Sequence, residues 1–293
     1  MRITESSMID HMRGNVQQSQ DNYNTTLNQL STGKKINQVS DDPVAASKSL
    51  AVRSMIADMD HYQRNAQAGK LFLQYSDGQL SSVTSLIDQA RQVAVAAANG
   101  GTLEDSSSAT YIGQIDSIIQ QVTQLANSDM DGRRIFAGTQ TKTEPFTQDD
   151  PIHAYHGDDG ALTSTVAPGV NIRLNESGQT IFAPIFSALE SLKADIRNGD
   201  YNSISTNDIG AVDAGLQGVL NARAQIGTKL NQISDTSDRI QSSQVHLQDQ
   251  LSSLEDTDLA TTYTQLQLSQ NVYQASLAST AKALQHSLID YLH

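Results

Sequence analysis

The chain has 293 residues with 32 acidic and 19 basic side chains, which gives a formal net charge of −13 at pH 7. This charge disfavours nucleic acid and anionic membrane surfaces as partners, because both repel an acidic protein. Hydrophobic residues make up only 38% of the chain and Trp is absent, so a single thick globular core is not expected. The absence of Cys excludes disulfides, thiolate nucleophiles and Cys-ligated zinc.

The hydrophobic runs are short. The longest, Val93 to Ala98, is far below the roughly 20 residues that cross a bilayer. The first residues, MRITESSMIDHM, contain no apolar stretch of the Sec-signal type. Taken alone, this predicts a soluble protein that is not exported by that route.

Residues 1–41 are predicted to form a helix followed by a connector. Alternating steps of three and four, the heptad pattern of a packed helix, join Ile9, Met12, Val16, Ser19, Tyr23, Thr26 and Leu30. Gly33 follows where such a helix needs a left-handed residue, and Lys34 and Lys35 suit that helix's negative carboxyl end. The polar members make a thin seam, so we expect a terminal arm that becomes ordered only against partners.

A second helix is predicted to begin at about Asp42, within a first helical part that spans 42–140. Asp41 and Asp42 offer carboxylates to free backbone amides, and Pro43 suits a first helical turn. The heptad series then runs through Val52, Met55, Met59, Tyr62, Ala66, Gly69, Leu73, Ser76, Leu80, Val83, Ile87, Ala90, Ala94 and Ala97. A shorter series, Ile112, Ile115, Ile119, Val122 and Ala126, predicts the return helix of a hairpin.

Residues 141–208 differ from both sides and are predicted to be a variable, β-rich insert with a short helix. Glycines interrupt this segment, and residues 169–174 alternate with period two, which predicts short antiparallel strands with turns. Residues 185–197 are expected to be helical, with an apolar face formed by Ile185, Leu189, Leu192 and Ile196.

The heptad pattern returns in a second helical part, 209–255, and in a C-terminal arm, 256–293. The first series is Ile209, Val212, Leu216, Val219, Arg223, Ile226, Leu230, Ile233, Ser237, Ile240, Gln244, Leu247, Leu251 and Leu254. It breaks at residues 255–258, EDTD, which we interpret as caps or a solvated face. The last series is Leu259, Tyr263, Leu266, Gln270, Tyr273, Leu277, Thr280 and Leu284. We therefore expect a mainly α protein: an elongated rod of long antiparallel helices with coiled-coil-like terminal arms and a small β-rich inserted outer domain.

The search for catalytic or metal-binding residues gives only weak candidates. Gly33-Lys34 lacks the rest of a phosphate-binding loop, and residues 129–132, DMDG, lack the ligand spacing of a calcium loop and favour a capped turn. His153 and His156, among acidic neighbours, are the best metal candidates, although a solvated polar loop is favoured. We expect no enzyme activity, cofactor or metal; a secreted helical adhesin or enzyme that acts through this insert is the alternative from another class.

Three motifs carry a family resemblance. Residues 30–37, LSTGKKIN, followed by residues 40–47, SDDPVAAS, closely resemble the N-terminal motif of the bacterial flagellin family. Residues 131–139, DGRRIFAGT, resemble the segment that leads into the outer domain in that family, and residues 274–278 and 287–292 resemble its closing helix. The Asp-Asp-Pro and Ala-Ala-Ser variant is more similar to the hook-associated protein 3 branch than to flagellin proper, which is the nearest alternative.

The resemblance implies an extracellular structural protein of the flagellum that passes through the type III exporter. It implies a ring between hook and filament, with about eleven copies of the chain. The other implied partners are the first hook-filament junction protein, flagellin and a flagellar export chaperone. It also implies that Gly33, Asp41, Asp42 and Pro43 form a hinge with caps, and that the arms pair on assembly. The implied subunit-interface residues are Ile9, Met12, Val16, Tyr23, Leu30, Leu259, Tyr263, Leu266, Tyr273, Leu277, Leu284 and Leu288.

Overall fold

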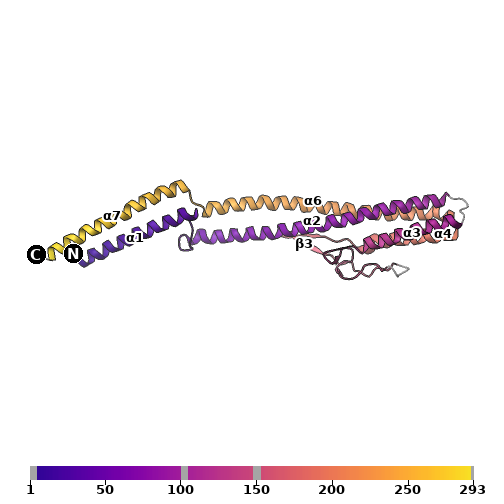
Figure 1. Ribbon diagram of the computed structural model, residues 1–293, viewed down its shortest axis with the longest axis horizontal. Coiled ribbons are helices and arrows are strands. Elements are labelled where there is room, and N and C mark those ends of the chain that lie inside the picture. Colours follow the sequence, from indigo (N-terminus) through magenta and orange to yellow (C-terminus); the bar gives the residue numbers. More distant parts are fainter. Residues whose placement is uncertain (1–4, 100–104, 148–152, 292–293) are drawn as a thin grey trace. The chain divides into compact units, whose positions relative to one another are not determined.

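The computed structural model describes residues 5–99, 105–147 and 153–291, and long helices dominate it (Figure 1). Two compact units can be distinguished: unit 1 comprises Met1–Asp58 and Ser243–His293, and unit 2 comprises Met59–Ser242. The helices α2 (Pro43–Ala98) and α6 (Ile209–Glu255) contribute residues to both units. The prediction of a mainly α protein with long helices and short strands is confirmed.

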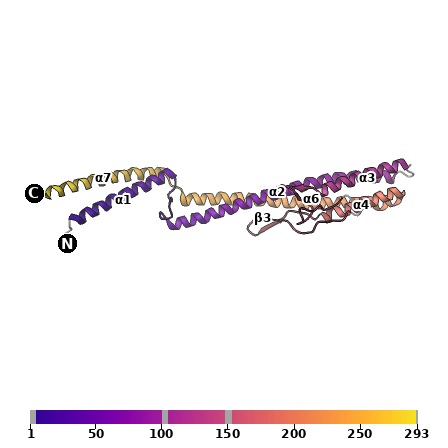
Figure 2. The same ribbon diagram turned by 60° about the horizontal axis from the view of Figure 1, so that its bottom comes forward.

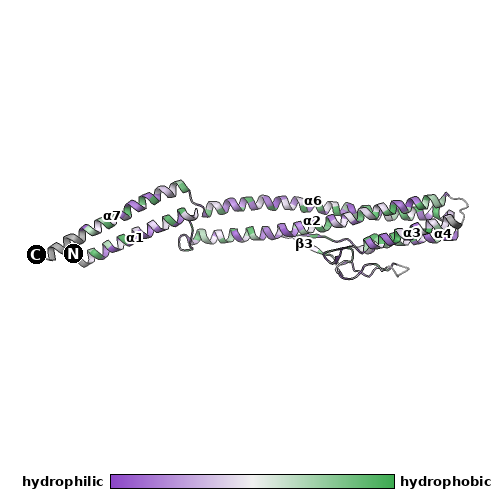
Figure 3. Ribbon diagram, in the orientation of Figure 1, coloured by the Kyte–Doolittle hydropathy of each residue, from purple (hydrophilic) through white to green (hydrophobic). Residues whose placement is uncertain are grey.

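In unit 1, the helices α1 (Glu5–Thr32) and α7 (Leu259–Tyr291) lie side by side (Figure 2). They are antiparallel, because Lys34 after the end of α1 pairs with Asp256 before α7, while Tyr23 stacks on Tyr273. Apolar and polar residues alternate along both helices (Figure 3). This pattern is the thin seam that the sequence predicts.

In unit 2, α2 and α6 run antiparallel, and cross-helix contacts fix their register. Arg223 Nε donates to Asp77 Oδ1 over 2.9 Å, and Arg91 Nε donates to Asp213 Oδ1 over 2.7 Å. The predicted heptad positions form the core, with Ala66, Leu73, Leu80, Val83, Ile87, Ala90, Ala94 and Ala97 of α2 and Val212, Val219, Ile226 and Ile233 of α6 fully buried. This part of the predicted register is confirmed, and each large apolar side chain buried this way contributes about 1.5–3 kcal/mol.

The helices α3 (Asp105–Ala126) and α4 (Gly178–Asn198) complete the bundle and pack against each other. The predicted apolar face of α4, Ile185 to Ile196, is buried as expected. The helix begins earlier than predicted, however, at Gly178, where Ser177 Oγ accepts the Thr180 N–H. Pro184 lies inside α4, one residue before the predicted start, so the prediction was wrong about where this helix begins. The short α5 (Tyr201–Ser203) and the π-helix η1 (Ile204–Asp208) then lead into α6.

The strands form two hairpins. β1 (Asp129–Met130) pairs with β2 (Arg133–Arg134) across a turn in which Asp131 and Gly132 have φ of 52° and 72°. Positive φ at both central residues is the turn that matches the twist of two paired strands. β3 (Thr163–Ala167) pairs with β4 (Val170–Arg173), so the predicted antiparallel strands are confirmed.

An aromatic cluster holds the remaining part of the insert on α4. Phe136, just before the insert, and Phe146 within it pack edge-on against Phe182, with ring centroids 5.0 and 5.8 Å from that of Phe182. Beside them, Gly138 has φ of 68°, and a Cβ there would lie 1.9 Å from the Asp158 carbonyl oxygen. Only glycine fits this position, which accounts for the AGT of the sequence motif.

Candidate assembly surface

The connector between α1 and α2 is shaped by local hydrogen bonds. Gly33 has φ of 71° after the end of α1. Asp41 Oδ2 accepts the N–H groups of Asn37 and Gln38, each over 2.9 Å. Asp42 Oδ1 accepts two N–H groups from the first turn of α2, and Pro43 is the first residue of that helix. The carboxylates therefore satisfy backbone donors that a polar connector otherwise leaves to water.

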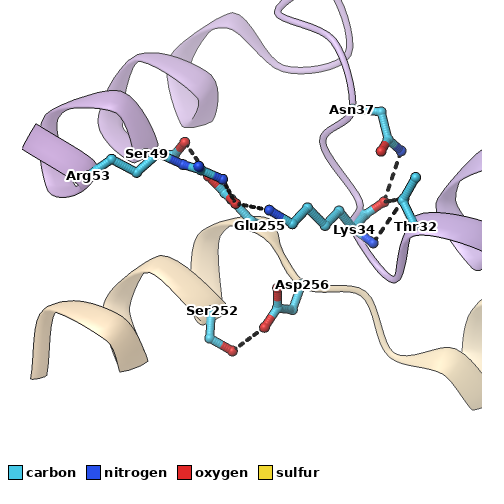
Figure 4. A network of polar contacts seen from close by, with 8 residues as sticks. All are labelled: Thr32, Lys34, Asn37, Ser49, Arg53, Ser252, Glu255 and Asp256. Carbon is cyan, nitrogen blue, oxygen red and sulfur yellow. Dashed lines mark hydrogen bonds and ion pairs between the residues drawn. The ribbon is translucent and has the colours of Figure 1, made fainter. Parts of the chain in front are cut away.

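A buried carboxylate ties this connector to the end of α6. Glu255 Oε1 accepts from Ser49 Oγ over 2.6 Å and from Arg53 Nε over 2.8 Å. Its Oε2 accepts from Arg53 Nη2 over 2.6 Å and from Lys34 Nζ over 2.8 Å. Figure 4 shows Glu255 between Lys34 on one side and Ser49 and Arg53 on the other. We call these four residues the Glu255 cluster.

The geometry stabilises the ionised form of Glu255. Its side chain is 6% exposed, while those of Lys34 and Arg53 are 40% and 49% exposed. The forked Arg53 pair, followed by the bonds from Lys34 and Ser49, holds the pKa of Glu255 well below its usual range against the opposing effect of burial. The interpretation of this residue as a cap or solvated face was wrong, since its partners lie some 200 positions away in the sequence.

Backbone contacts reinforce the same junction. The Lys35 N–H donates to the Glu255 carbonyl over 2.7 Å, and the Thr257 N–H donates to the Gly33 carbonyl over 2.9 Å. Lys35 Nζ also donates to the Ser253 carbonyl over 2.7 Å. The two lysines were expected to neutralise the carboxyl end of α1, but they bind the last turn of α6 instead.

The predicted α1 residues form the seam with α7. Met12, Val16, Tyr23 and Leu30 are half-buried, and the Tyr23 ring stacks on Tyr273 with centroids 6.3 Å apart. Ile9 is the exception and is exposed. A hollow of about 380 Å³ between the two helices is lined largely by polar side chains, which agrees with the polar character of the seam.

The predicted register of α7 is confirmed at Leu266, Tyr273 and Thr280 but not at every position. Thr262, Leu266 and Ser269 are buried, and Tyr273, Ser276 and Thr280 are half-buried. The expected positions Leu259, Tyr263 and Leu277 are instead 56%, 55% and 43% exposed. Hydroxyl-bearing residues therefore share the seam with Leu266, while other large apolar residues face outward. The side chains of Leu284 and Leu288 lie outside the described residues.

The insert shows no metal site among the described residues. No group of three or more His, Asp or Glu side chains in the described part of the chain could hold a metal ion. His153 is 7% exposed and stacks on Phe186 with centroids 4.5 Å apart, whereas His156 is exposed. The expectation of a solvated loop is therefore wrong for His153, which packs on the aromatic cluster. No described helix has the length and apolar character that a membrane crossing requires.

Comparisons with known proteins agree with this architecture. The bacterial flagellin N-terminal helical region matches residues 3–141, and the bacterial flagellin C-terminal helical region matches residues 209–292. Flagellar hook-associated protein 3 of Salmonella typhimurium is 29% identical, over 94% of this chain and 95% of that protein. The protein of the same name from Escherichia coli is 27% identical over the same shares.

A solved structure shares the fold. The putative flagellar hook-associated protein of Vibrio parahaemolyticus superimposes with a TM-score of 0.69 at 22% identity, over 74% of this chain and all of that one. The two flagellin regions lie on the helices that build unit 1 and most of the unit 2 bundle. The chain belongs to the bacterial flagellin family.

Proposed function

We propose that this protein is an extracellular structural subunit of the bacterial flagellum that joins the hook to the filament and has no enzyme activity. The observation that carries the proposal is similarity to hook-associated protein 3 from two organisms over 94% of this chain and 95% of each relative. The two flagellin regions include both terminal helices, and both of these helices expose large apolar side chains.

The exposed residues of α7 support assembly through this helix. At 100° per residue, Leu259, Tyr263 and Leu277 share one flank of the helix, and Leu268 and Val272 share another. All five are at least 43% exposed. A subunit in a ring meets two neighbours through different surfaces, so two apolar flanks beside the α1 seam fit a head-to-tail ring. The family resemblance suggests about eleven subunits in such a ring.

The proposed partners follow from this surface. Copies of the chain cover the α7 flanks within the ring, and the first junction protein and flagellin contact its hook and filament sides. Before assembly, an export chaperone shields the same apolar residues from water. Each large side chain that an interface buries contributes about 1.5–3 kcal/mol, so a weak seam becomes stable when repeated around a ring.

Deletion of the gene in its source bacterium tests the junction role. We expect bare hooks by electron microscopy, flagellin lost to the medium, and recovery of motility when the gene is returned. Intact filaments on motile deletion cells would contradict the proposal.

Point variants test the proposed surface in the same deletion strain. Tyr263→Asp or Leu277→Asp places a charge on the apolar flank, and we expect motility and filament attachment to be lost. Asn271→Asp is the matched control, because it adds the same charge at an exposed position of α7 that lies outside both apolar flanks. Circular dichroism of each purified variant should show the helical melting transition of the wild type.

The filament itself is the second location to consider, because the flagellin of Bacillus subtilis is 23% identical over 97% of this chain. Immunogold labelling separates the two cases. A junction subunit gives one labelled band between hook and filament, whereas a filament subunit is labelled along the whole length.

A further inference from the structure

A second buried carboxylate lies in unit 2, at the point where α4 meets the start of α6. Asp208 is the last residue of η1 and is 2% exposed. π-Helical turns are rare, and this one places Asp208 against α4, with which η1 packs. Ile204 on η1 and Leu192 and Ile196 on α4 are also buried, so the packing between these two elements is largely apolar.

The hydrogen bonding of Asp208 is incomplete when its carboxylate is ionised. Its Oδ1 accepts from Ser191 Oγ over 2.8 Å. Its Oδ2 is buried and meets no donor among the residues that the structure describes. The acidic neighbour on α4 is Asp195, one turn after Ser191, and it raises the pKa of Asp208 both through its charge and through its side-chain hydrogen bonding. Two ionised carboxylates can only accept, so no bond forms between them unless one holds a proton.

The charged groups that face Asp208 from the packed elements are both acidic. Asp195 belongs to α4, and Asp200 precedes α5, where its Oδ1 accepts the Ser203 N–H over 3.0 Å. Asp200 is engaged as the N-cap of α5. Burial is the largest influence that raises the pKa of Asp208, and Asp195 and Asp200 raise it further, whereas the Ser191 bond lowers it.

We propose that Asp208 holds a proton on Oδ2, facing the side chain of Asp195, and that release of this proton loosens the packing of η1 on α4. The proton turns Oδ2 into a donor and removes a negative charge from a buried site. Proton loss places a buried charge beside two further acidic residues, and separation of η1 from α4 relieves the repulsion. This end of unit 2 is therefore stabilised by acid.

The direction of the pH dependence follows from the raised pKa of Asp208. The folded state holds the proton at pH values where the unfolded chain, with an Asp pKa near 3.9, has already lost it. The stabilisation is complete below the unfolded value and is lost as the pH rises through the folded value. Between the two, the equilibrium for opening changes by up to tenfold per pH unit.

Hydrogen exchange measured by mass spectrometry on the full chain provides the test. We expect amides of residues 191–208 to lose protection with rising pH, by up to tenfold per pH unit after correction for intrinsic exchange. Asp208→Asn keeps a donor toward Asp195 without a charge, so this segment should stay protected across the range. Asp88→Asn, an exposed carboxylate on α2, is the matched control and should behave as the wild type.

A second variant keeps the proposal testable if Asp208→Asn fails to fold. Ser191→Ala removes the one neighbour that lowers the pKa of Asp208, so NMR of labelled Asp carboxyl carbons should show its titration moved to higher pH. An Asp208 carboxyl that titrates at or below the ordinary Asp value would overturn the proposal. So would protection of residues 191–208 by millimolar Ca²⁺ or Mg²⁺ that vanishes in Asp208→Asn, because a cation would then occupy the site.

Discussion

Two buried carboxylates in this chain sit in opposite electrostatic surroundings. Glu255 in unit 1 meets two cations and a hydroxyl, whereas Asp208 in unit 2 meets one hydroxyl and two further carboxylates. The first arrangement lowers the pKa and the second raises it. Burial alone therefore does not determine the direction of a carboxyl pKa shift. Neighbouring cations and donors lower the pKa, whereas neighbouring carboxylates raise it.

The two carboxylates also lie at two different kinds of junction between chain segments. The Glu255 cluster joins segments about 200 residues apart in the sequence. It lies where the terminal helices α1 and α7 connect to α2 and α6 within unit 1. The side chains of its two cations, Lys34 and Arg53, are about half exposed to water. A charged cluster of this kind suits a junction that must hold its geometry at neutral pH. Asp208 joins two neighbouring segments of the chain and depends on a proton instead.

Loss of the Glu255 charge is expected to give the largest effect. Glu255→Gln keeps the shape but leaves Arg53 and Lys34 without their counter-charge, so the free energy of unfolding of unit 1 should fall by about 2–3 kcal/mol. The rate of hydrogen exchange in the connector, residues 33–42, measures this loss of stability. The control is Asp249→Asn on an exposed position of α6, and equal protection in the two variants would show that the cluster contributes nothing.

The pH response of the two sites is expected to have opposite signs. The lowered pKa of Glu255 means that its stabilisation is present above the unfolded Glu value, near 4.3, and is lost as the pH falls through the folded value. Asp208 loses its stabilisation as the pH rises. Exchange rates followed from pH 3 to pH 8 should therefore increase toward acid around the connector and toward base in residues 191–208. Exchange rates that change in the same direction with pH in both segments would contradict this prediction.

How well the sequence predicts the packing register of a helix depends on which residue types form its contacts. The registers of α2 and α6 could be predicted because Leu, Ile, Val and Ala mark the buried face directly. The register of α7 could be predicted only in part, because its seam also uses Thr262 and Ser269, which sequence patterns assign to the surface. Small hydroxyl residues let two helices approach while larger apolar residues remain for other contacts.

The Glu255 cluster was missed for a different reason. Its members are spread over residues 34, 49, 53 and 255, and no local spacing connects the last with the others. A single acidic residue after the last heptad position was a weak signal, and its interpretation as a cap used only local chemistry. Asp208 likewise carried no signal, because its neighbours become neighbours only through the fold of η1 on α4.

The smallest expected effect concerns the shape of the cation opposite Glu255. Arg53 binds both carboxylate oxygens through Nε and Nη2, and a lysine ammonium cannot reproduce this fork. Arg53→Lys keeps the charge, so we expect a loss of only about 1 kcal/mol in the free energy of unfolding of unit 1, reduced by the exposure of the pair to water. Lys48→Arg, an exposed cation on the same helix, is the matched control and should leave exchange of the connector unchanged. If Arg53→Lys were as damaging as Glu255→Gln, the fork geometry would dominate over the charge, and the contrast with Asp208 would rest on hydrogen-bond shape instead of electrostatics.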